Sequence, residues 1–441
     1  MTPARLKQIR QLLWVYFWLL IFEGALRKWL LPGLSTPLLL VRDPVALLAL
    51  IWGWPLLQQR PWRGWLQPLL WIGPIALLLA ITTGHRDIPT ALFGARILLL
   101  QLPLIFLFPA VFNRADVIRF GWVMLWLCIP MALLIATQST LPETHILNVG
   151  PGGTGTAVFD GIGERFRPPG TFSFITGVAS FFTLAAASLF VVLYAAPIRQ
   201  RGRLFCMVAG IALVVAIPVS ISRSLLAGYL VVATSTVAAL TLSRTPIVRL
   251  VSGLVALALA VGVATSVPAF QNSTDAFVAR WDAASNVDRE QVGDVGVAVD
   301  QFQSRILPGF TGPLNRLNTI PLTGYGIGIG TNFGAQRLTG GSRFLVGEGA
   351  WEVSLAELGV ILGLAFLAWR TALAIWILRM ALKVARQGNR LPLILAGASC
   401  LDVLGGQISQ PTGLGFVVIS AGLTLAACNP GPLLAAPRRV P

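Results

Sequence analysis

Residues 347–363 read Gly-Glu-Gly-Ala-Trp-Glu-Val-Ser-Leu-Ala-Glu-Leu-Gly-Val-Ile-Leu-Gly, and they carry the chain from a long polar segment into an apolar one. The polar segment, about residues 268–349, is rich in Arg, Asp, Gly and Asn. Because the chain on either side is mostly apolar, this segment must lie in water, whereas the acids that follow it enter lipid. We therefore expect functional residues at this boundary.

The composition is that of a protein embedded in a membrane. Of the 441 residues, 55% are hydrophobic and only 11% are charged, and the mean hydropathy is +0.76, which excludes an ordinary soluble domain. Apolar runs of roughly 17 to 23 residues predict about twelve helical spans. They lie near residues 11–31, 37–57, 65–81, 92–112, 120–138, 174–195, 204–221, 224–242, 249–267, 351–371, 391–409 and 412–428. The sequence therefore predicts an all-α polytopic membrane protein.

These spans divide the chain into three parts. Residues 1–267 are expected to contain spans one to nine, with an external loop at 139–173. Residues 268–350 form one large external loop between spans nine and ten, and residues 351–441 contain spans ten to twelve and a short cytoplasmic tail.

The distribution of charge orients the spans. More than half of the 33 basic residues precede the first span or fall at every second loop after it. The positive-inside rule then places both termini in the cytoplasm and the loops at 82–91, 139–173 and 268–350 outside. The basic residues form short clusters at span ends without interleaved aromatics, so no nucleic-acid partner is predicted. The four cysteines lie in or beside spans, which indicates packing and not a disulfide framework.

Several ionisable residues fall at one depth, in the outer half of the predicted spans. Charges at such a depth usually face a partner or a water-filled cavity. The set comprises Glu23, Arg27, Lys28, Arg42, Asp43 and Arg96, with Arg223 in a very short outer hairpin. Each one alone is explained by snorkelling or by a structural ion pair, but the shared depth predicts an outer-leaflet cavity. Four residues of the outer loops and of the start of span ten would complete it: Arg165, Arg167, Glu348 and Glu352.

A basic cavity at this depth suits a substrate with an anionic head and a lipid tail. Arginine binds phosphate oxygens in a bidentate manner and keeps its charge. The outer segments contain no Asp-x-Asp and no Cys pair, and the two histidines, His85 and His145, are far apart. The sequence therefore predicts no metal site and no cofactor, with arginines in place of a cation.

Four motifs carry a family resemblance. Arg167–Phe172 is similar to an Arg-x-x-Gly-Thr-Phe pattern at the start of a span, and Ser222–Arg223 to a Ser-Arg at an outer helix end. Residues 321–328 are similar to Pro-x-x-Gly-x-Gly-x-Gly, and residues 355–359 to Leu-x-Glu-x-Gly. With the predicted layout of spans, the chain resembles bacterial O-antigen ligases and Wzy-type O-antigen or exopolysaccharide polymerases. These are membrane glycosyltransferases that use polyprenyl-diphosphate-linked glycans.

The resemblance implies a GT-C-like fold in the bacterial inner membrane, with the active site facing the periplasm or exterior. The donor diphosphate would bind among Arg167, Arg223 and Arg280. Further substrate contacts would come from Arg165, Tyr325 and Glu352, with support inside the membrane from Glu23, Arg27, Arg96 and Glu357. A polysaccharide flippase and a chain-length regulator are implied as partners, beside membrane lipid.

One position departs from the family pattern. Counting back from Glu357, Glu348 occupies the place of a family histidine that is thought to assist the acceptor hydroxyl. A carboxylate can do this as a general base, so Glu348 and Arg223 are the predicted catalytic residues. We expect a metal-independent, inverting polymerase of lipid-linked repeat units. The alternatives are a ligase that transfers the glycan to lipid A core, and, in another class, a lipid-linked oligosaccharide flippase or other transporter. Transport would favour internal repeats, which the sequence does not display.

Two further features have open interpretations. The alternating glycines of residues 324–330 permit a tight structural turn, or they present N–H groups to an anion or sugar. Glu357 lies about 13 Å deeper than Glu348 at 1.5 Å per helical residue. We expect it to pair with a cation from another span, and Asp402 to do the same, with Arg370 as the candidate partner.

Overall fold

The computed structural model describes residues 1–59, 61–153, 167–195, 199–243, 309–340, 345–347 and 349–429. Over these residues the regular structure is entirely helical, and ten helices are long and apolar enough to cross a membrane. Large side chains such as Trp71 on α3 (Trp62–Thr82) and Trp126 on α6 (Arg114–Thr140) are 71% and 65% exposed, as expected of surfaces that face lipid. The protein is a polytopic membrane protein.

The first half of the chain is helical from its start. Its elements are α1 (Pro3–Ala25) with η1 (Leu26–Leu30), η2 (Pro32–Leu34), η3 (Pro37–Leu40), α2 (Asp43–Leu57), α3 (Trp62–Thr82), α4 (Ile88–Arg96) with η4 (Ile97–Gln101), η5 (Leu102–Phe106) and α5 (Leu107–Val111), α6 (Arg114–Thr140), η6 (Ile146–Asn148), α7 (Ile175–Ala195), α8 (Gln200–Ser220) and α9 (Arg223–Leu242). The second half contains η7 (Leu317–Thr319), α13 (Asn332–Thr339), α14 (Ala350–Arg386), α15 (Leu391–Gly405) and α16 (Pro411–Cys428).

Ten of the predicted spans coincide with long apolar helices. The predicted span at 391–409 is α15, which has 15 residues and is therefore only about 22 Å long. This short helix packs against α7, α9, α14 and α16, and its residues Leu391–Ser399 are buried. The predicted span at 249–267, and most of the predicted external loop at 268–350, lie outside the described residues.

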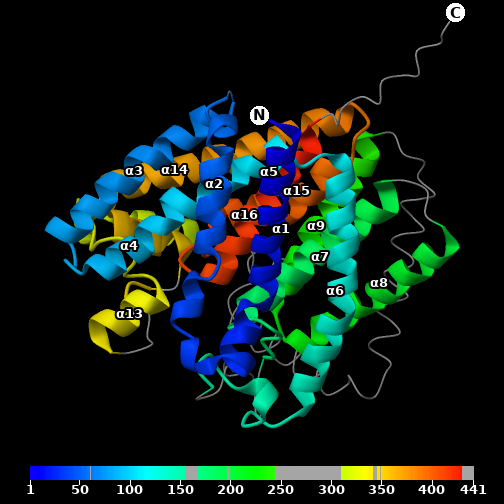
Figure 1. Cartoon of the computed structure of the whole chain (residues 1–441), viewed down its shortest axis with the longest axis horizontal. Helices are drawn as coiled ribbons and strands as arrows, with labels where there is room; N and C mark the ends of the chain where they lie inside the picture. Colours follow the sequence, from blue (N-terminus) through cyan, green and yellow to red (C-terminus); the bar gives the residue numbers. More distant parts are fainter. Residues whose placement is uncertain are drawn as a thin grey trace, which may run out of the picture.

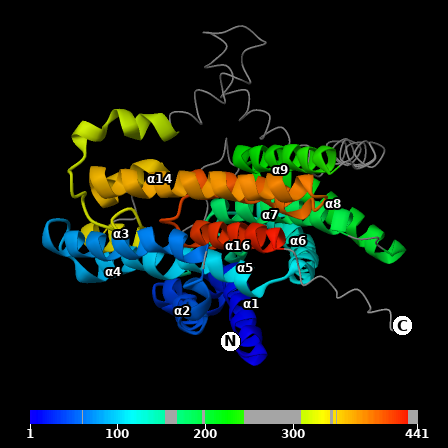
Figure 2. The same ribbon diagram turned by 90° about the horizontal axis from the view of Figure 1, so that it is seen from above.

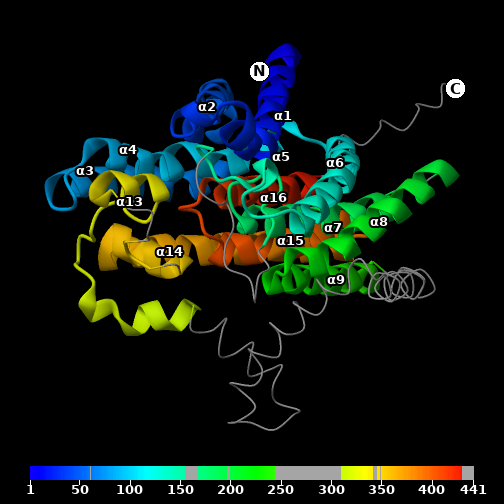
Figure 3. The ribbon, with the colours of Figure 1, turned by 90° about the horizontal axis from the view of Figure 1, so that it is seen from below.

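Helix α16 forms the centre of the molecule. Every residue of α16 from Leu414 to Cys428 is buried. Figures 2 and 3 show α16 between a layer that contains α1 and α2 and a layer that contains α14 and α9. Small residues allow these contacts, since a Cβ on Gly422 would lie 2.5 Å from the Phe108 ring. The tight packing of α16 fixes the turn that precedes it, residues 406–410.

Loops gather at two opposite ends of the bundle (Figure 1). At one end, Arg10 donates to the Val111 carbonyl, and Asn389 joins the Arg114 side chain to the Ala427 carbonyl. Arg10 and Arg114, from two of the loops that the charge pattern makes cytoplasmic, lie at this end. The other end contains the segments at 26–42, 82–87, 167–174, 321–330 and 406–410.

Candidate functional site

A buried ion pair lies where α1 approaches the start of α2. The side chain of Arg42 donates from Nε to Glu23 Oε2 at 2.9 Å, and the two residues are only 2% and 3% exposed. A second guanidinium, that of Arg27, lies 3.8 Å from Glu23 Oε1. Arg42 also donates to the Pro411 carbonyl at 2.6 Å, so it links α16 to this cluster. Glu23 and Arg27 thus face charged partners, which is the structural ion pair that the sequence left as the alternative to a cavity.

A second carboxylate, Asp43, extends the cluster toward α4. Arg96 Nη1 lies 2.9 and 2.8 Å from the two Asp43 oxygens. Gln101 donates to Asp43 and accepts from the Tyr16 hydroxyl, both at 2.5 Å, and Arg42 donates to that hydroxyl at 3.3 Å. The two ion pairs therefore belong to one continuous network, which we call the α1–α4 charge network.

The loop before α7 is attached to this network by two cations. Lys28, only 2% exposed, donates from Nζ to the Gly170 carbonyl at 2.6 Å. Arg27 donates to Ser173 Oγ at 3.0 Å. The network contains three guanidinium groups, Arg27, Arg42 and Arg96, and two carboxylates, Glu23 and Asp43. The described part of the network therefore has an excess of positive charge.

Arg167 lies in this loop, and Arg223 begins α9. Burial and the charge of Arg223 both lower the pKa of Arg167. The buried Nε of Arg167 has no hydrogen-bond partner among the described residues. The α8–α9 turn sets the position of Arg223, because Ile221 adopts a left-handed conformation with φ 48° and Ser222 caps α9 through the Leu225 N–H. A bound anion would offset the repulsion between these two guanidinium groups.

The glycine-rich segment 321–330 is inserted into a break in α14. Gly359 has φ 77° and ψ 177° inside this helix, which frees backbone groups on either side. The Tyr325 N–H donates to the Ala356 carbonyl at 2.8 Å, and Gly326 N–H donates to the Glu357 carbonyl at 3.2 Å. A Cβ on Gly324 would lie 2.4 Å from the Gly359 nitrogen, so this approach needs glycine. Two motifs distant in sequence are therefore in direct contact.

Glu357 has a different partner from the predicted one. No ion pair forms between Glu357 and the described residues; its Oε1 accepts hydrogen bonds from the N–H groups of Gly328 and Gly330, at 3.0 and 2.8 Å. The prediction of a cation from another span is wrong because the inserted segment supplies its own donors. The alternating glycines do bind an anion, but the anion is a side chain of the same protein, so the segment is a structural turn.

Arg370 lies beside Asp402, as predicted, but it meets backbone oxygens. It donates to the carbonyls of Val403 and Gly406 at 2.8 Å and approaches that of Asp402 at 3.4 Å. These carbonyls belong to the end of α15, where no further helical turn can satisfy them. Arg370 therefore caps this short helix inside the protein.

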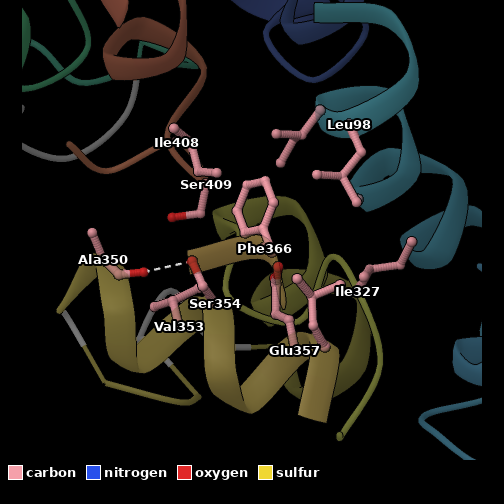
Figure 4. A pocket seen from close by; sticks show the side chains of 12 residues that line it. Leu98, Ile327, Ala350, Val353, Ser354, Glu357, Phe366, Ile408 and Ser409 are labelled. Carbon is pink, nitrogen blue, oxygen red and sulfur yellow. Dashed lines mark hydrogen bonds between the residues drawn. The ribbon is translucent and has the colours of Figure 1, made fainter. Parts of the chain in front are cut away.

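A small cavity lies beside Glu357 (Figure 4). The figure shows Glu357, Ser354 and Phe366 of α14 facing Leu98 of η4 and Ser409 of the turn before α16. The Ser354 hydroxyl donates a hydrogen bond to the Ala350 carbonyl at 2.7 Å. The turn with Ser409 leads directly to Pro411, whose carbonyl binds Arg42, and so connects this cavity with the α1–α4 charge network.

A larger groove of about 540 Å³ lies over the first turns of α14. Residues 309–320 form one wall, and Tyr325 and Ile329 form another; the lining includes Arg316, Glu352 and Ala356. Phe310 packs edge-on against Trp351 with 5.0 Å between ring centroids, which holds the first wall on α14. We call this hollow the α14 groove.

The structure groups the predicted residues into two sites. Glu23, Arg27 and Arg96 belong to the α1–α4 charge network, with Arg167 in the loop that this network holds and the charge of Arg223 acting on it. Tyr325 and Glu352 line the α14 groove, and Glu357 accepts a hydrogen bond from Gly330 of the segment that carries Tyr325. Glu348, Arg165 and Arg280 lie outside the described residues.

Sequence reasoning missed Tyr16, Gln101 and the role of Arg316. The first two are uncharged and lie in apolar runs, so no pattern marks them. Within the described residues, no group of three or more His, Cys, Asp or Glu lies close enough to hold a metal ion.

No protein-family model matches this sequence, and searches among curated proteins and among solved structures found no match. The resemblance to O-antigen ligases and Wzy-type polymerases therefore rests on the four motifs.

Proposed function

We propose that this protein is a membrane glycosyltransferase that polymerises polyprenyl-diphosphate-linked oligosaccharide repeat units into a cell-surface polysaccharide. The observation that carries the proposal is the pair of arginines, Arg167 and Arg223, beside a buried network with excess positive charge. A diphosphate at the membrane surface requires fixed cations, and guanidinium groups supply charge and paired donors together.

The proposed reaction is a single displacement at the anomeric carbon of the donor. The acceptor hydroxyl oxygen attacks this carbon and gives its proton to Glu348, while the bond from the carbon to the diphosphate oxygen breaks. The bonding electrons leave with the diphosphate, whose developing negative charge is stabilised by Arg167 and Arg223, with Arg280 as a further predicted contact. A single displacement inverts the anomeric configuration. The arginines fill the role that a divalent cation plays elsewhere.

Deletion of the gene in its host separates this proposal from its competitors. Loss of a polymerase leaves the surface acceptor with a single repeat unit in place of a ladder on a gel. Loss of a ligase removes all of the glycan from the acceptor, while polymer persists on the lipid carrier. Loss of a flippase leaves lipid-linked single units on the inner face of the membrane. The proposal predicts the first pattern, and either of the other two would contradict it.

The arginine site is tested by complementing the deletion. Arg167→Ala and Arg223→Ala proteins should restore little or no ladder, and Arg223→Lys should restore only part of it because lysine lacks the planar fork. Arg86→Ala is the matched control, since Arg86 is exposed and its Nε donates only to the neighbouring Thr82 carbonyl. A complete ladder from the Arg223→Ala protein, at normal abundance, would count decisively against the site.

A further inference from the structure

The α14 groove differs in chemistry from the arginine site. Arg316 and Glu352 bring one charge of each sign to its lining, and Thr319 adds a hydroxyl. Neither the Arg316 guanidinium nor the Glu352 carboxylate forms a hydrogen bond or ion pair with the described residues. The remaining lining is largely apolar or backbone. A groove with one charge of each sign and few other polar groups suits a neutral polyhydroxylated ligand better than a diphosphate.

Tyr325 lines this groove from a fixed backbone position. Its side chain is 44% exposed, although its backbone is held at both ends. The Tyr325 N–H donates to the Ala356 carbonyl at 2.8 Å, and its carbonyl accepts from the His85 N–H at 3.1 Å. The glycines on either side, Gly324 and Gly326, have φ of 74° and 105°, conformations that other residues adopt only with strain. A backbone held in this way limits where the exposed ring can lie, which lowers the entropic cost of stacking on a ligand.

Glu357 keeps this ring in place without touching the groove. Its carboxylate binds the N–H groups of Gly328 and Gly330, just beyond Tyr325, and its carbonyl binds Gly326. His85 Nε2 donates to the Ile327 carbonyl at 3.0 Å, while its Nδ1 accepts from the Asp87 N–H, which sets this tautomer. The segment is therefore fastened from two sides.

We infer that the α14 groove is a saccharide-binding subsite, distinct from the arginine site, that holds the sugar chain of the lipid-linked substrate. This inference rests on the proposed function. The apolar face of a pyranose, made of C–H groups, stacks on the Tyr325 ring, and sugar hydroxyls bond to Glu352 and Arg316. The volume of about 540 Å³ lies within the range of ligand pockets. Glu357 is a positioning residue for the ring.

The test uses a probe that has sugar but no diphosphate. The lipid-free oligosaccharide, released by mild acid from the polysaccharide of the host, is titrated onto the whole protein in nanodiscs, and saturation-transfer NMR identifies the sugar protons in contact. Tyr325→Ala should weaken binding roughly tenfold, as loss of a stacking ring does elsewhere. Tyr325→Phe keeps the ring and should bind like the wild type.

Two further variants separate the subsite from its surroundings. Glu352→Gln should weaken binding severalfold, whereas Glu143→Gln, an exposed outer-face acid far from the groove in sequence, should leave it unchanged. Arg167→Ala should bind the oligosaccharide normally, since the probe has no diphosphate. Glu357→Gln should reduce saturation transfer to the sugar ring protons. Gly330→Ala should do the same, because its Cβ would lie 2.3 Å from Val353 Cγ1 and 3.0 Å from Glu357 Oε1.

Equal affinity of the wild-type, Tyr325→Ala and Glu352→Gln proteins would overturn the inference, and so would no binding by the folded wild-type protein. If Tyr325→Ala builds the full ladder with unchanged oligosaccharide affinity, the subsite is wrong and the proposed polymerase stands. If the oligosaccharide binds through Tyr325 but deletion of the gene leaves the ladder intact, the subsite is supported and polymerisation is wrong.

Discussion

Glu23 is the carboxylate on which the positions of several buried side chains depend. It is 3% exposed and receives Arg42 at 2.9 Å and Arg27 at 3.8 Å. Removal of one partner from a buried ion pair leaves the other charge uncompensated, and this costs more than the pair itself contributes. The positions of both arginines, and of the α7 loop that Arg27 holds, therefore depend on one carboxylate.

We expect Glu23→Gln to lower the free energy of unfolding by roughly 3–5 kcal/mol. The measurement is denaturant or thermal unfolding of the purified protein in one detergent. Glu143→Gln is the control, because Glu143 is exposed and should change stability by less than about 0.5 kcal/mol. Equal stability of the Glu23→Gln and Glu143→Gln proteins would show that the network is not required for folding.

At the residue scale, the buried charged side chains could be predicted from sequence, but the groups that they contact could not. Glu23, Arg27 and Arg96 are visible because charges interrupt apolar runs. Gln101 bridges Tyr16 and Asp43, yet nothing marks an amide in a leucine-rich stretch. The contact of Arg42 with the Pro411 carbonyl depends on the packing of α16, which local pattern does not encode.

At the scale of elements, the break in α14 requires glycine at position 359. A Cβ on Gly359 would lie 2.3 Å from the Leu322 carbonyl oxygen, and φ is 77°. Gly359→Ala should therefore displace the segment 321–330 from the helix. Gly340→Ala is the matched control, because Gly340 has φ 68° with nothing within 4 Å and should cost only the backbone term of roughly 1–2 kcal/mol.

Hydrogen exchange across residues 321–330 measures this displacement. Amides of Gly328 and Gly330, which bind Glu357, should lose protection in Gly359→Ala and keep it in Gly340→Ala. Equal protection in both variants would mean that the segment does not depend on the break.

Docking of α13 should depend on pH. Asp87 accepts from Thr90 and from Arg337, the latter at 2.8 Å, and these hydrogen bonds lower the pKa of Asp87 from 3.8 to about 2. A lowered carboxyl pKa gives stability that is present above 3.8 and lost as pH falls toward about 2. Intrinsic-rate-corrected protection of α13 amides should fall in this window. In the Asp87→Asn protein, the protection of α13 amides should be low at every pH. The Arg86→Gln protein is the control and should behave like the wild type. Protection that does not change with pH in the wild-type protein would contradict the role of Asp87.

Long spans were predictable at this scale because length and apolarity suffice, whereas the contact between two of the motifs was not. Residues 321–330 and Gly359 each appeared as a glycine pattern, but only the fold brings one into the break of the other. The predicted cation for Glu357 failed for the same reason, since backbone N–H groups leave no signature in sequence.

For the whole molecule, the alternation of basic loops agrees with the two ends at which the loops gather. Arg10 and Arg114 lie at one end and Lys28 and Arg42 at the other. The positive-inside rule predicts that the first end is cytoplasmic. Both proposed sites belong to the opposite end, which this orientation would place at the outer leaflet, where the proposed lipid-linked sugar lies.

Cysteine labelling tests this orientation. The native cysteines are free, and three of the four are buried. Glu143→Cys should react with a membrane-impermeant maleimide on intact spheroplasts, and Arg386→Cys only after the membrane is opened, since both positions are exposed but lie at opposite ends. The reverse pattern would place the proposed sites on the cytoplasmic side and contradict the account.

Polymerisation by the purified protein is the most direct test of the central claim. The wild-type chain in nanodiscs, given a lipid-linked repeat unit of its own pathway and EDTA, should produce a ladder of products on a gel. Arg223→Ala and Glu348→Gln proteins should produce none at equal stability, and Arg86→Ala should match the wild type. An unchanged ladder from Arg223→Ala, or no ladder from folded wild-type protein with intact donor, would contradict the claim.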